Sequence, residues 1–268
     1  MRDVYDIRKL PSSSEVAAAF LDAAHWEDST AHLSNVYRTG VIFDVDGHRE
    51  EINESCTQQS EGQILWYITR QLRPTLIIET GFGRGASAAF FLSALSPWHG
   101  KLISIDPYFR GWAGETGRTF VRQLGLEQNH VLLEVPSEIA LPMHVAKKPA
   151  EKIKFAYIDG CHHFDSALID FIYFDRMLEI GGVIGFDDAP APAVWTVTSF
   201  IANNFPYRLH YATRRLVLCQ KVAENNREWT HFRPFTASSK SDWALHQELP
   251  DQDVVPNATF GPDIGAGL

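Results

Sequence analysis

The chain has few cysteines, no dense run of basic residues and no long apolar segment, and each of these absences excludes a class of protein. Only three of its 268 residues are cysteines, too few and too scattered for a disulfide framework or a zinc knuckle. The net charge of −9 argues against a nucleic acid or an acidic membrane as the main partner. No apolar run approaches the length of a membrane span, and the charged first ten residues do not match a secretory signal. We therefore expect a cytoplasmic protein without nucleic-acid or membrane partners.

The chain does contain enough apolar sequence for a sizeable core, because 45% of its residues are hydrophobic. From residue 60 onward, short apolar strands alternate with helical segments, a pattern typical of a mostly parallel sheet with helices on both faces. Two later strands, at 207–212 and 215–222, are expected to pair antiparallel around a tight turn. The expected parallel strands are 75–79, 101–106, 131–135, 153–159 and 183–187, and the expected helices are 60–72, 86–95, 118–124, 165–178 and 193–203, with one more starting at Ser137.

This pattern divides the chain into three regions. Residues 1–58 form a mixed N-terminal extension, with a helix expected at 14–24 and a strand or turn at 40–47. Residues 59–222 form the main domain. Residues 223–268 form a tail that is rich in proline but also carries aromatic residues such as Trp229 and Trp243. Because such aromatics favour packing on another surface, we expect the tail to contact another subunit and the protein to be a homo-oligomer.

A glycine loop, Glu79-Thr80-Gly81-Phe82-Gly83-Arg84-Gly85, follows the first parallel strand. Glycines let the backbone bend tightly and approach a ligand, and the next helix offers unpaired N–H groups. No Lys-Ser/Thr follows, so the loop is not of the phosphate-binding Walker kind. Glu79 could meet a ligand amine, and Asp106, at the end of the second strand, could bridge ribose hydroxyls. The pattern also fits a dinucleotide fold, so it predicts a nucleoside cofactor without choosing one.

Carboxylates also end the last two parallel strands, at Asp159 and at Asp187-Asp188. Strands joined by a helical crossover finish at the same edge of a sheet, so these groups and His162 should converge. Carboxylates at such short distances repel one another unless a cation or a shared proton lies among them. Neighbouring residues of a strand point to opposite faces of the sheet. Asp187 and Asp188 can therefore both bind the same ion only if the strand breaks between them.

Several of these residues also have ordinary structural interpretations. Asp159 could cap the helix that follows it. The role of Asp188 could be limited to starting the helix after the last parallel strand. Ser137, after the third strand, could border an adenine or cap a helix. Asp170 lies in the middle of a helix and is expected to be solvated or to serve packing.

The glycine loop with Asp106 resembles motifs one and two of the class I S-adenosylmethionine-dependent methyltransferases, and the closing strand pair resembles the hairpin that separates them from dinucleotide-binding domains. Asp159-Gly160-Cys161-His162 with Asp187-Asp188 resembles the metal-dependent sugar O-methyltransferases of macrolide and aminocoumarin biosynthesis. The likeness covers residues 60–222 and implies a doubly wound, mostly parallel, seven-stranded Rossmann-like sheet with a C-terminal antiparallel strand pair. It implies that S-adenosylmethionine is held by Glu79, Thr80, Gly81, Gly83, Asp106, Ser137 and Asp159. It implies that Mg²⁺ is held by Asp159, Asp187 and Asp188. Catalysis is expected from Asp159 and His162, with the histidine acting as the base.

The expected activity is therefore Mg²⁺-assisted transfer of a methyl group to a hydroxyl of a small molecule, such as a sugar or a natural product. A metal ion would stabilise the alkoxide that attacks the methyl group. The alternatives are a metal-independent N- or C-methyltransferase, a nicotinamide-dependent oxidoreductase using the same loop, and a non-catalytic cofactor-binding protein. The acceptor is not identified by the sequence.

Overall fold

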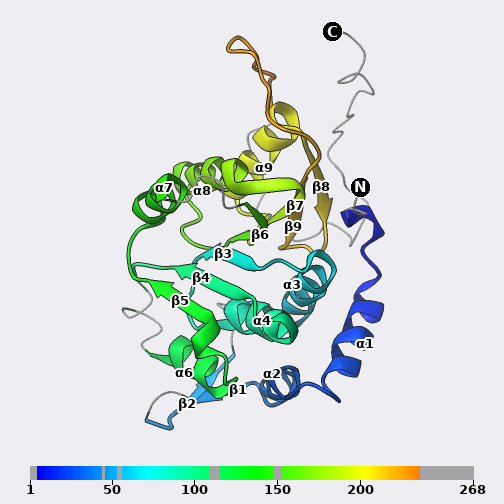
Figure 1. Cartoon of the computed structure of the whole chain (residues 1–268), viewed down its shortest axis with the longest axis vertical. Helices are drawn as coiled ribbons and strands as arrows, with labels where there is room; N and C mark the ends of the chain where they lie inside the picture. Colours follow the sequence, from blue (N-terminus) through cyan, green and yellow to red (C-terminus); the bar gives the residue numbers. More distant parts are fainter. Residues whose placement is uncertain are drawn as a thin grey trace.

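A seven-stranded sheet forms the centre of the computed structural model, which describes residues 5–235 except 44–45, 53–55, 109–110, 112–114 and 148–151 (Figure 1). The strand order is β5-β4-β3-β6-β7-β9-β8. Strands β3 to β7 run parallel, and β9 lies antiparallel to both β7 and β8. This confirms the predicted sheet and its closing strand pair. The strands are β3 (Leu76–Thr80), β4 (Lys101–Ile105), β5 (His130–Leu133), β6 (Ile153–Ile158), β7 (Leu178–Phe186), β8 (Tyr207–Tyr211) and β9 (Val217–Lys221).

Helices cover both faces of the sheet (Figure 1). One layer holds α3 (Gln59–Leu72), α4 (Ala86–Leu95) and α6 (Thr116–Gln123), with α1 (Ser13–Ala23) and α2 (Asp28–Thr39) outside them. The other layer holds α7 (Ser137–Lys147), α8 (Phe164–Met177) and α9 (Pro192–Asn204). The short elements are the 3-10 helices η1 (Ile7–Lys9), η2 (Ser96–Trp98) and η3 (Glu127–Asn129) and the hairpin of β1 (Val41–Phe43) and β2 (Arg49–Glu51).

The double layer follows from strands that are apolar on both faces. In β3, Ile77 packs into the cluster with α3 and α4, whereas its neighbour Ile78 packs into the cluster with α7, α8 and α9. Continuous apolar strands of this kind are typical of buried parallel sheets. The sheet is therefore buried on both faces, and its carboxyl edge is left to carry polar groups.

The N-terminal region is more regular than the sequence predicted. Helix α2 occupies residues for which the sequence predicted no element, and the strand-or-turn region at 40–47 begins with β1. The helix is largely polar, and only a few side chains such as Leu33 and Val36 enter the core, which left little apolar period to recognise. In α1, Phe20 packs on Trp66 and Phe90. The extension thus covers the main core, and a boundary at residue 58 stays a prediction.

The tail is described as far as residue 235. Phe232 and Phe235 pack beside Phe200 of α9, while Trp229 is 93% exposed. Residues 236–268, including Trp243, lie outside the described part of the chain. Packing on another subunit stays a prediction. None of the helices in the described ranges has the length and apolar character needed to cross a membrane.

Candidate active site

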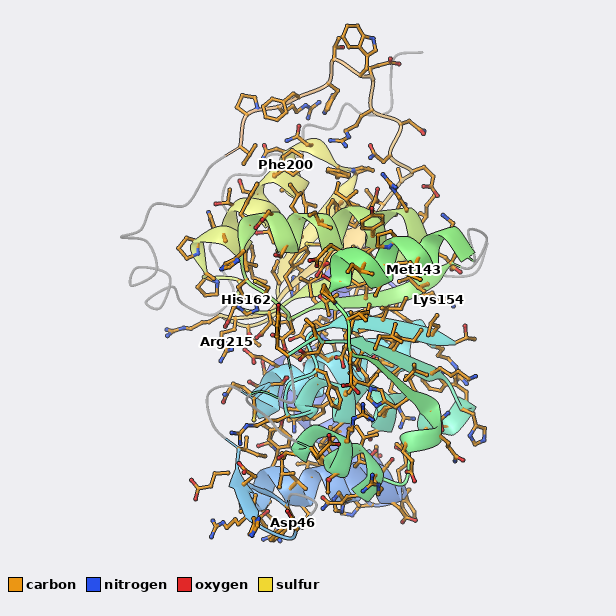
Figure 2. All side chains as sticks on the ribbon, turned by 90° about the vertical axis from the view of Figure 1, so that its left-hand side faces the viewer. Asp46, Met143, Lys154, His162, Phe200 and Arg215 are labelled. Atoms are coloured by element: carbon orange, nitrogen blue, oxygen red, sulfur yellow. The ribbon has the colours of Figure 1, made fainter. Side chains whose placement is uncertain are left out.

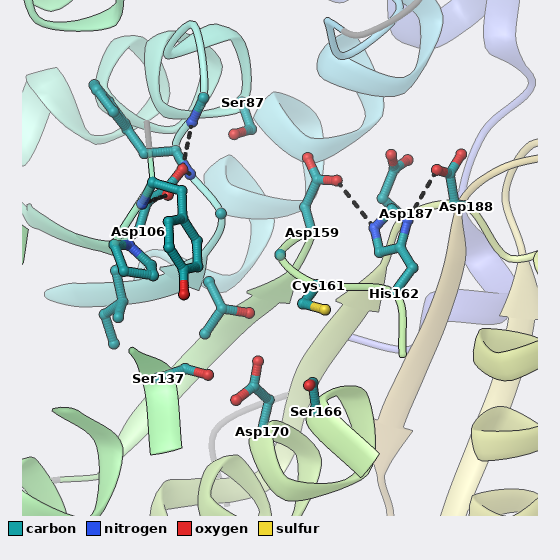
Figure 3. Close-up of a pocket in the computed structure, with 18 of the residues that line it drawn as sticks. Ser87, Asp106, Ser137, Asp159, Cys161, His162, Ser166, Asp170, Asp187 and Asp188 are labelled. Carbon is teal, nitrogen blue, oxygen red and sulfur yellow. Dashed lines mark hydrogen bonds and ion pairs between the residues drawn. The ribbon is translucent and has the colours of Figure 1, made fainter. Parts of the chain in front are cut away.

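A cavity of about 700 Å³ opens at the carboxyl edge of the parallel strands (Figure 3). Backbone hydrogen bonds join the strand ends there: Asp159 N donates to Thr80 O at 2.8 Å, and Asp187 N donates to Ile158 O at 3.0 Å. The predicted convergence is therefore observed. Of the predicted site residues, the cavity is lined by Thr80, Gly81, Gly83, Asp106, Ser137, Asp159, His162, Asp187 and Asp188.

The glycine loop has a backbone that only glycine accepts readily. Gly81, Gly83 and Gly85 all have positive φ, of 88°, 48° and 74°, a region that costs other residues energy. A Cβ atom on Gly81 would also lie 1.9 Å from the carbonyl oxygen of Asp159. The loop and the end of β6 are therefore in direct backbone contact, which couples the two predicted motifs.

Asp106 fixes the shape of this loop. Its Oδ2 accepts hydrogen bonds from Phe82 N at 3.0 Å and Gly83 N at 2.9 Å, and its Oδ1 accepts one from Tyr108 N at 2.8 Å. A carboxylate oxygen has more than one lone pair, so these bonds still leave capacity for a ribose hydroxyl in the cavity.

Glu79 lies beneath the loop and not in the cavity wall. Its carboxyl is fully buried and accepts hydrogen bonds from Ser104 Oγ at 2.6 Å and Ser87 Oγ at 2.8 Å. Burial raises the pKa of Glu79 to about 8, although the two hydroxyls lower it. This placement favours support of the loop. The predicted contact of Glu79 with the cofactor has no support from the geometry and stays a prediction.

His162 lies between two carboxylates of the predicted cluster (Figure 3). Its Nδ1 is 3.0 Å from Asp188 Oδ2, and its Nε2 is 3.6 Å from Asp159 Oδ1. Burial lowers the pKa of His162, but the hydrogen bonds and charges of Asp159 and Asp188 outweigh it and raise the pKa to about 10. The imidazole therefore carries a proton at neutral pH in the free protein.

The strand end required at the acidic pair is present. Strand β7 ends at Phe186, and Asp188 has a left-handed φ of 48°, a strained conformation for a non-glycine residue. Neither structural alternative holds for the carboxylates: the N-caps of α8 and α9 are His163 and Ala191, and no side chain caps either helix. Asp159 and Asp188 thus line the cavity and do not cap a helix.

Arg215 completes the cluster and was not predicted. It lies after β8 in the turn before β9, and its Nη2 is 2.8 Å from Asp188 Oδ1 and 3.2 Å from Asp187 Oδ2. Glu61 of α3 lies behind it, with Oε1 4.0 Å from Arg215 Nε. Burial, together with the charge of Asp187, raises the pKa of Glu61 to about 7 although Arg215 lowers it. Figure 2 shows Arg215 and His162 at the same edge of the sheet.

The predicted metal ligands are therefore engaged by protein groups. Arg215 holds Asp187 and Asp188, and His162 holds Asp188 and Asp159. The Asp159 and Asp187 carboxyls also contact each other, and burial raises the pKa of both, so they can share a proton. Within the described ranges, no group of three or more His, Cys, Asp or Glu side chains is placed to hold a metal ion. As placed, the side chains do not fit Mg²⁺.

Asp170 is a cavity residue that the sequence did not identify as one. It is 3% exposed and lines the cavity from α8, so it is not solvated. Burial raises its pKa to about 6, and the hydroxyls of Ser137 and Thr80 lower it. No sequence motif marks it, because its distance from Ser137 becomes short only when α7 and α8 pack together.

Residues 78–189 match the family model described as a methyltransferase domain. No curated protein matches the sequence. Among solved structures, the chain is similar to the SAH-bound methyltransferase PaMTH1 of Podospora anserina, with 14% identity over 80% of this chain and 98% of that one and a TM-score of 0.54. It is also similar to the O-methyltransferase TomG of Streptomyces achromogenes, in complex with SAM, with 16% identity over 64% and 84% of the two chains and a TM-score of 0.54. The chain is also similar to a methyltransferase of Geobacter sulfurreducens, with 17% identity over 83% of this chain and 100% of that one and a TM-score of 0.50.

The structural likenesses, all at low identity, show the fold. The family match shows a methyltransferase domain at residues 78–189. The prediction of a methyltransferase from the glycine loop, Asp106 and the closing strand pair is confirmed.

Proposed function

We propose that this protein transfers a methyl group from S-adenosylmethionine to a hydroxyl of a small molecule. The observation that carries this proposal is the row Asp159–His162–Asp188, in which the imidazole is 3.0 Å from Asp188 and within ion-pair distance, 3.6 Å, of Asp159. These residues line the same cavity as the glycine loop and Asp106. The cavity therefore combines a place for a nucleoside with groups able to handle a proton next to it.

The cofactor side of the cavity fits S-adenosylmethionine by its donors and acceptors. Asp106 can face ribose hydroxyls, and the positive-φ loop around Gly81 and Gly83 allows close backbone approach. Thr80, Ser137 and Asp170 line the same cavity and offer further polar contacts. When bound, S-adenosylmethionine supplies an activated sulfonium methyl, so the protein has to align the acceptor and remove its proton.

The proton side is formed by Asp159 and His162. Asp188 binds His162 Nδ1 and so fixes the ring with Nε2 directed to Asp159 Oδ1, 3.6 Å away. As the new C–O bond forms, the sulfonium C–S bond breaks and leaves S-adenosylhomocysteine, and the acceptor proton passes to Asp159 Oδ1, because the His162 imidazole already carries a proton. His162 holds the Asp159 carboxylate beside the acceptor. A neutral hydroxyl is a weak nucleophile that needs such a group, whereas an amine acceptor does not need to lose a proton before it attacks. This difference favours oxygen over nitrogen as the acceptor atom.

The acceptor class is supported by the cavity and by one relative. TomG is an O-methyltransferase involved in tomaymycin synthesis, and we propose that this chain also acts on a hydroxylated natural product or sugar. No step of this mechanism is assigned to a metal ion, because Arg215 and His162 engage the carboxylates that would bind it.

The experiment is a screen of hydroxylated acceptors that follows release of S-adenosylhomocysteine. Wild type should turn over at least one acceptor, and Asp159→Asn and His162→Gln should lose most of that turnover while binding S-adenosylhomocysteine as wild type does. His25→Gln, at an exposed histidine after α1, is the matched control and should be unaffected. Equal turnover in all four proteins would refute the assigned roles, and methylation confined to amine acceptors would refute O-methylation.

A further inference from the structure

The structure assigns to Arg215 the role of an internal cation for the acidic cluster, in the position where the resembling sugar O-methyltransferases would use Mg²⁺. We infer that it holds the acidic pair and places positive charge beside the acceptor oxygen. This inference rests on the proposed function, which it deepens by stating how the site balances its charge.

The first observation is how the guanidinium contacts the pair. A single nitrogen, Nη2, reaches Asp188 Oδ1 at 2.8 Å and Asp187 Oδ2 at 3.2 Å. The Asp187 side chain is 5% exposed, and a buried carboxylate is stabilised by a cationic partner or by a shared proton. Arg215 also lines the cavity, so its charge is available to a bound acceptor.

The second observation is that hydrogen bonds fix the backbone of the turn from which the Arg215 side chain extends to the acidic pair. Thr213 Oγ1 accepts from Arg215 N at 3.1 Å and from Leu216 N at 3.0 Å, while it donates to Glu61 Oε1 at 3.2 Å. On the opposite side, Ala189 N donates to Arg215 O at 2.8 Å. The turn is therefore tied both to α3 and to the segment that follows the acidic pair.

The third observation is the left-handed backbone of Asp188, with φ of 48°. This conformation lets Asp188 and Asp187 contact the same nitrogen of Arg215, although neighbouring residues of an extended strand would point apart. Asp188 Oδ2 is bound by His162 Nδ1 at 3.0 Å. Both oxygens of Asp188 are therefore engaged by cationic side chains, one by His162 and the other by Arg215.

A fixed guanidinium in this position opposes binding of a divalent cation by direct repulsion. Removing the charge should leave the acidic pair without its partner. Since oxygen ligands suit Mg²⁺ and Mn²⁺, the vacated carboxylates should then bind a divalent ion. The inference thus predicts that a metal-binding function is gained on mutation, which the loss of a merely structural contact would not produce.

The test uses full-length, metal-stripped protein, with Mn²⁺ binding followed by electron paramagnetic resonance and S-adenosylhomocysteine binding by calorimetry. Wild type should bind S-adenosylhomocysteine without metal and should bind Mn²⁺ weakly. Arg215→Gln should gain at least about tenfold in Mn²⁺ affinity, and a further Asp187→Asn change should abolish the gain. Arg215→Lys keeps the charge and should exclude Mn²⁺ as wild type does. Arg214→Gln, at the exposed neighbouring arginine, is the matched control.

Tight Mn²⁺ binding by wild type that is lost in Asp187→Asn would overturn the inference, and this result does not depend on whether any Arg215 variant folds. An Arg215→Gln protein that unfolds at the wild-type temperature yet gains no Mn²⁺ affinity would also overturn it. Failure of the proposed function has a different signature: wild type would not bind S-adenosylhomocysteine, whatever the Mn²⁺ result.

Discussion

Gly81→Ala tests the contact between the glycine loop and the end of β6. Gly81 has φ of 88°, and a left-handed backbone costs a residue with a side chain roughly 1–2 kcal/mol. The added Cβ would lie 1.9 Å from the carbonyl oxygen of Asp159, an obstacle that cannot rotate away because it is backbone. The loop and the strand end must therefore move apart.

That movement would affect two hydrogen bonds, Gly81 N to Ile105 O at 2.9 Å and Asp159 N to Thr80 O at 2.8 Å. Each such bond contributes about 1 kcal/mol net, so with the backbone strain we expect a loss of about 3 kcal/mol in the free energy of unfolding. Cofactor affinity should fall as well, because both sides of its cavity are displaced.

The assays are urea unfolding and calorimetric titration of S-adenosylhomocysteine. Gly125→Ala is the matched control: Gly125 has φ of 69° and no atom within 4 Å of an added Cβ, so it carries the backbone strain alone. It should lose only roughly 1–2 kcal/mol and bind the ligand normally. If Gly81→Ala proved as stable as Gly125→Ala and bound the ligand as wild type does, the account of this contact would be refuted.

Two further predictions concern titratable groups. The buried Glu79 has a pKa raised from 4.5 to about 8. The folded protein therefore keeps a proton that the unfolded chain releases, and stability should fall as pH rises from about 4.5 to 8. Glu79→Gln should flatten this slope in urea unfolding at several pH values, and unchanged slopes would contradict it. Asp188→Asn removes a carboxylate that raises the pKa of His162. NMR titration should then show the pKa of the imidazole lowered by at least about one unit; an unchanged value would show that Asp188 does not hold the ring.

Much of the fold could be predicted from the sequence because its signals are local. Short apolar strands alternate with helices, and Asp106, Asp159 and Asp187 each follow directly after a strand. Parallel topology alone brings these ends to one edge, so the cavity walls follow from the pattern. Helix α2 was missed because part of its buried face is polar, such as Thr30 Oγ1 with Ser93 Oγ at 2.7 Å. Leu33 and Val36 also enter the core, but they alone give little apolar period.

The residues missed at the site depend on packing between distant segments. Arg215 reaches the acidic pair only because β9 pairs with β7, and Glu61 reaches Arg215 from α3. The predicted position of Glu79 in the cavity wall was not observed, for another reason. Side chains of neighbouring strand residues point in opposite directions, so Thr80 lines the cavity while Glu79 is buried under the loop. The sequence placed the carboxylates but not the cation that pairs with them.

The central claim is that this cavity binds the methyl donor through Asp106 and the glycine loop. The most direct measurement is calorimetric titration of S-adenosylhomocysteine into metal-stripped wild type and into Asp106→Ala, with NADH as the competing ligand. We predict micromolar binding of S-adenosylhomocysteine to wild type, a large loss of affinity in Asp106→Ala, and no binding of NADH. Binding of NADH without binding of S-adenosylhomocysteine would contradict the account.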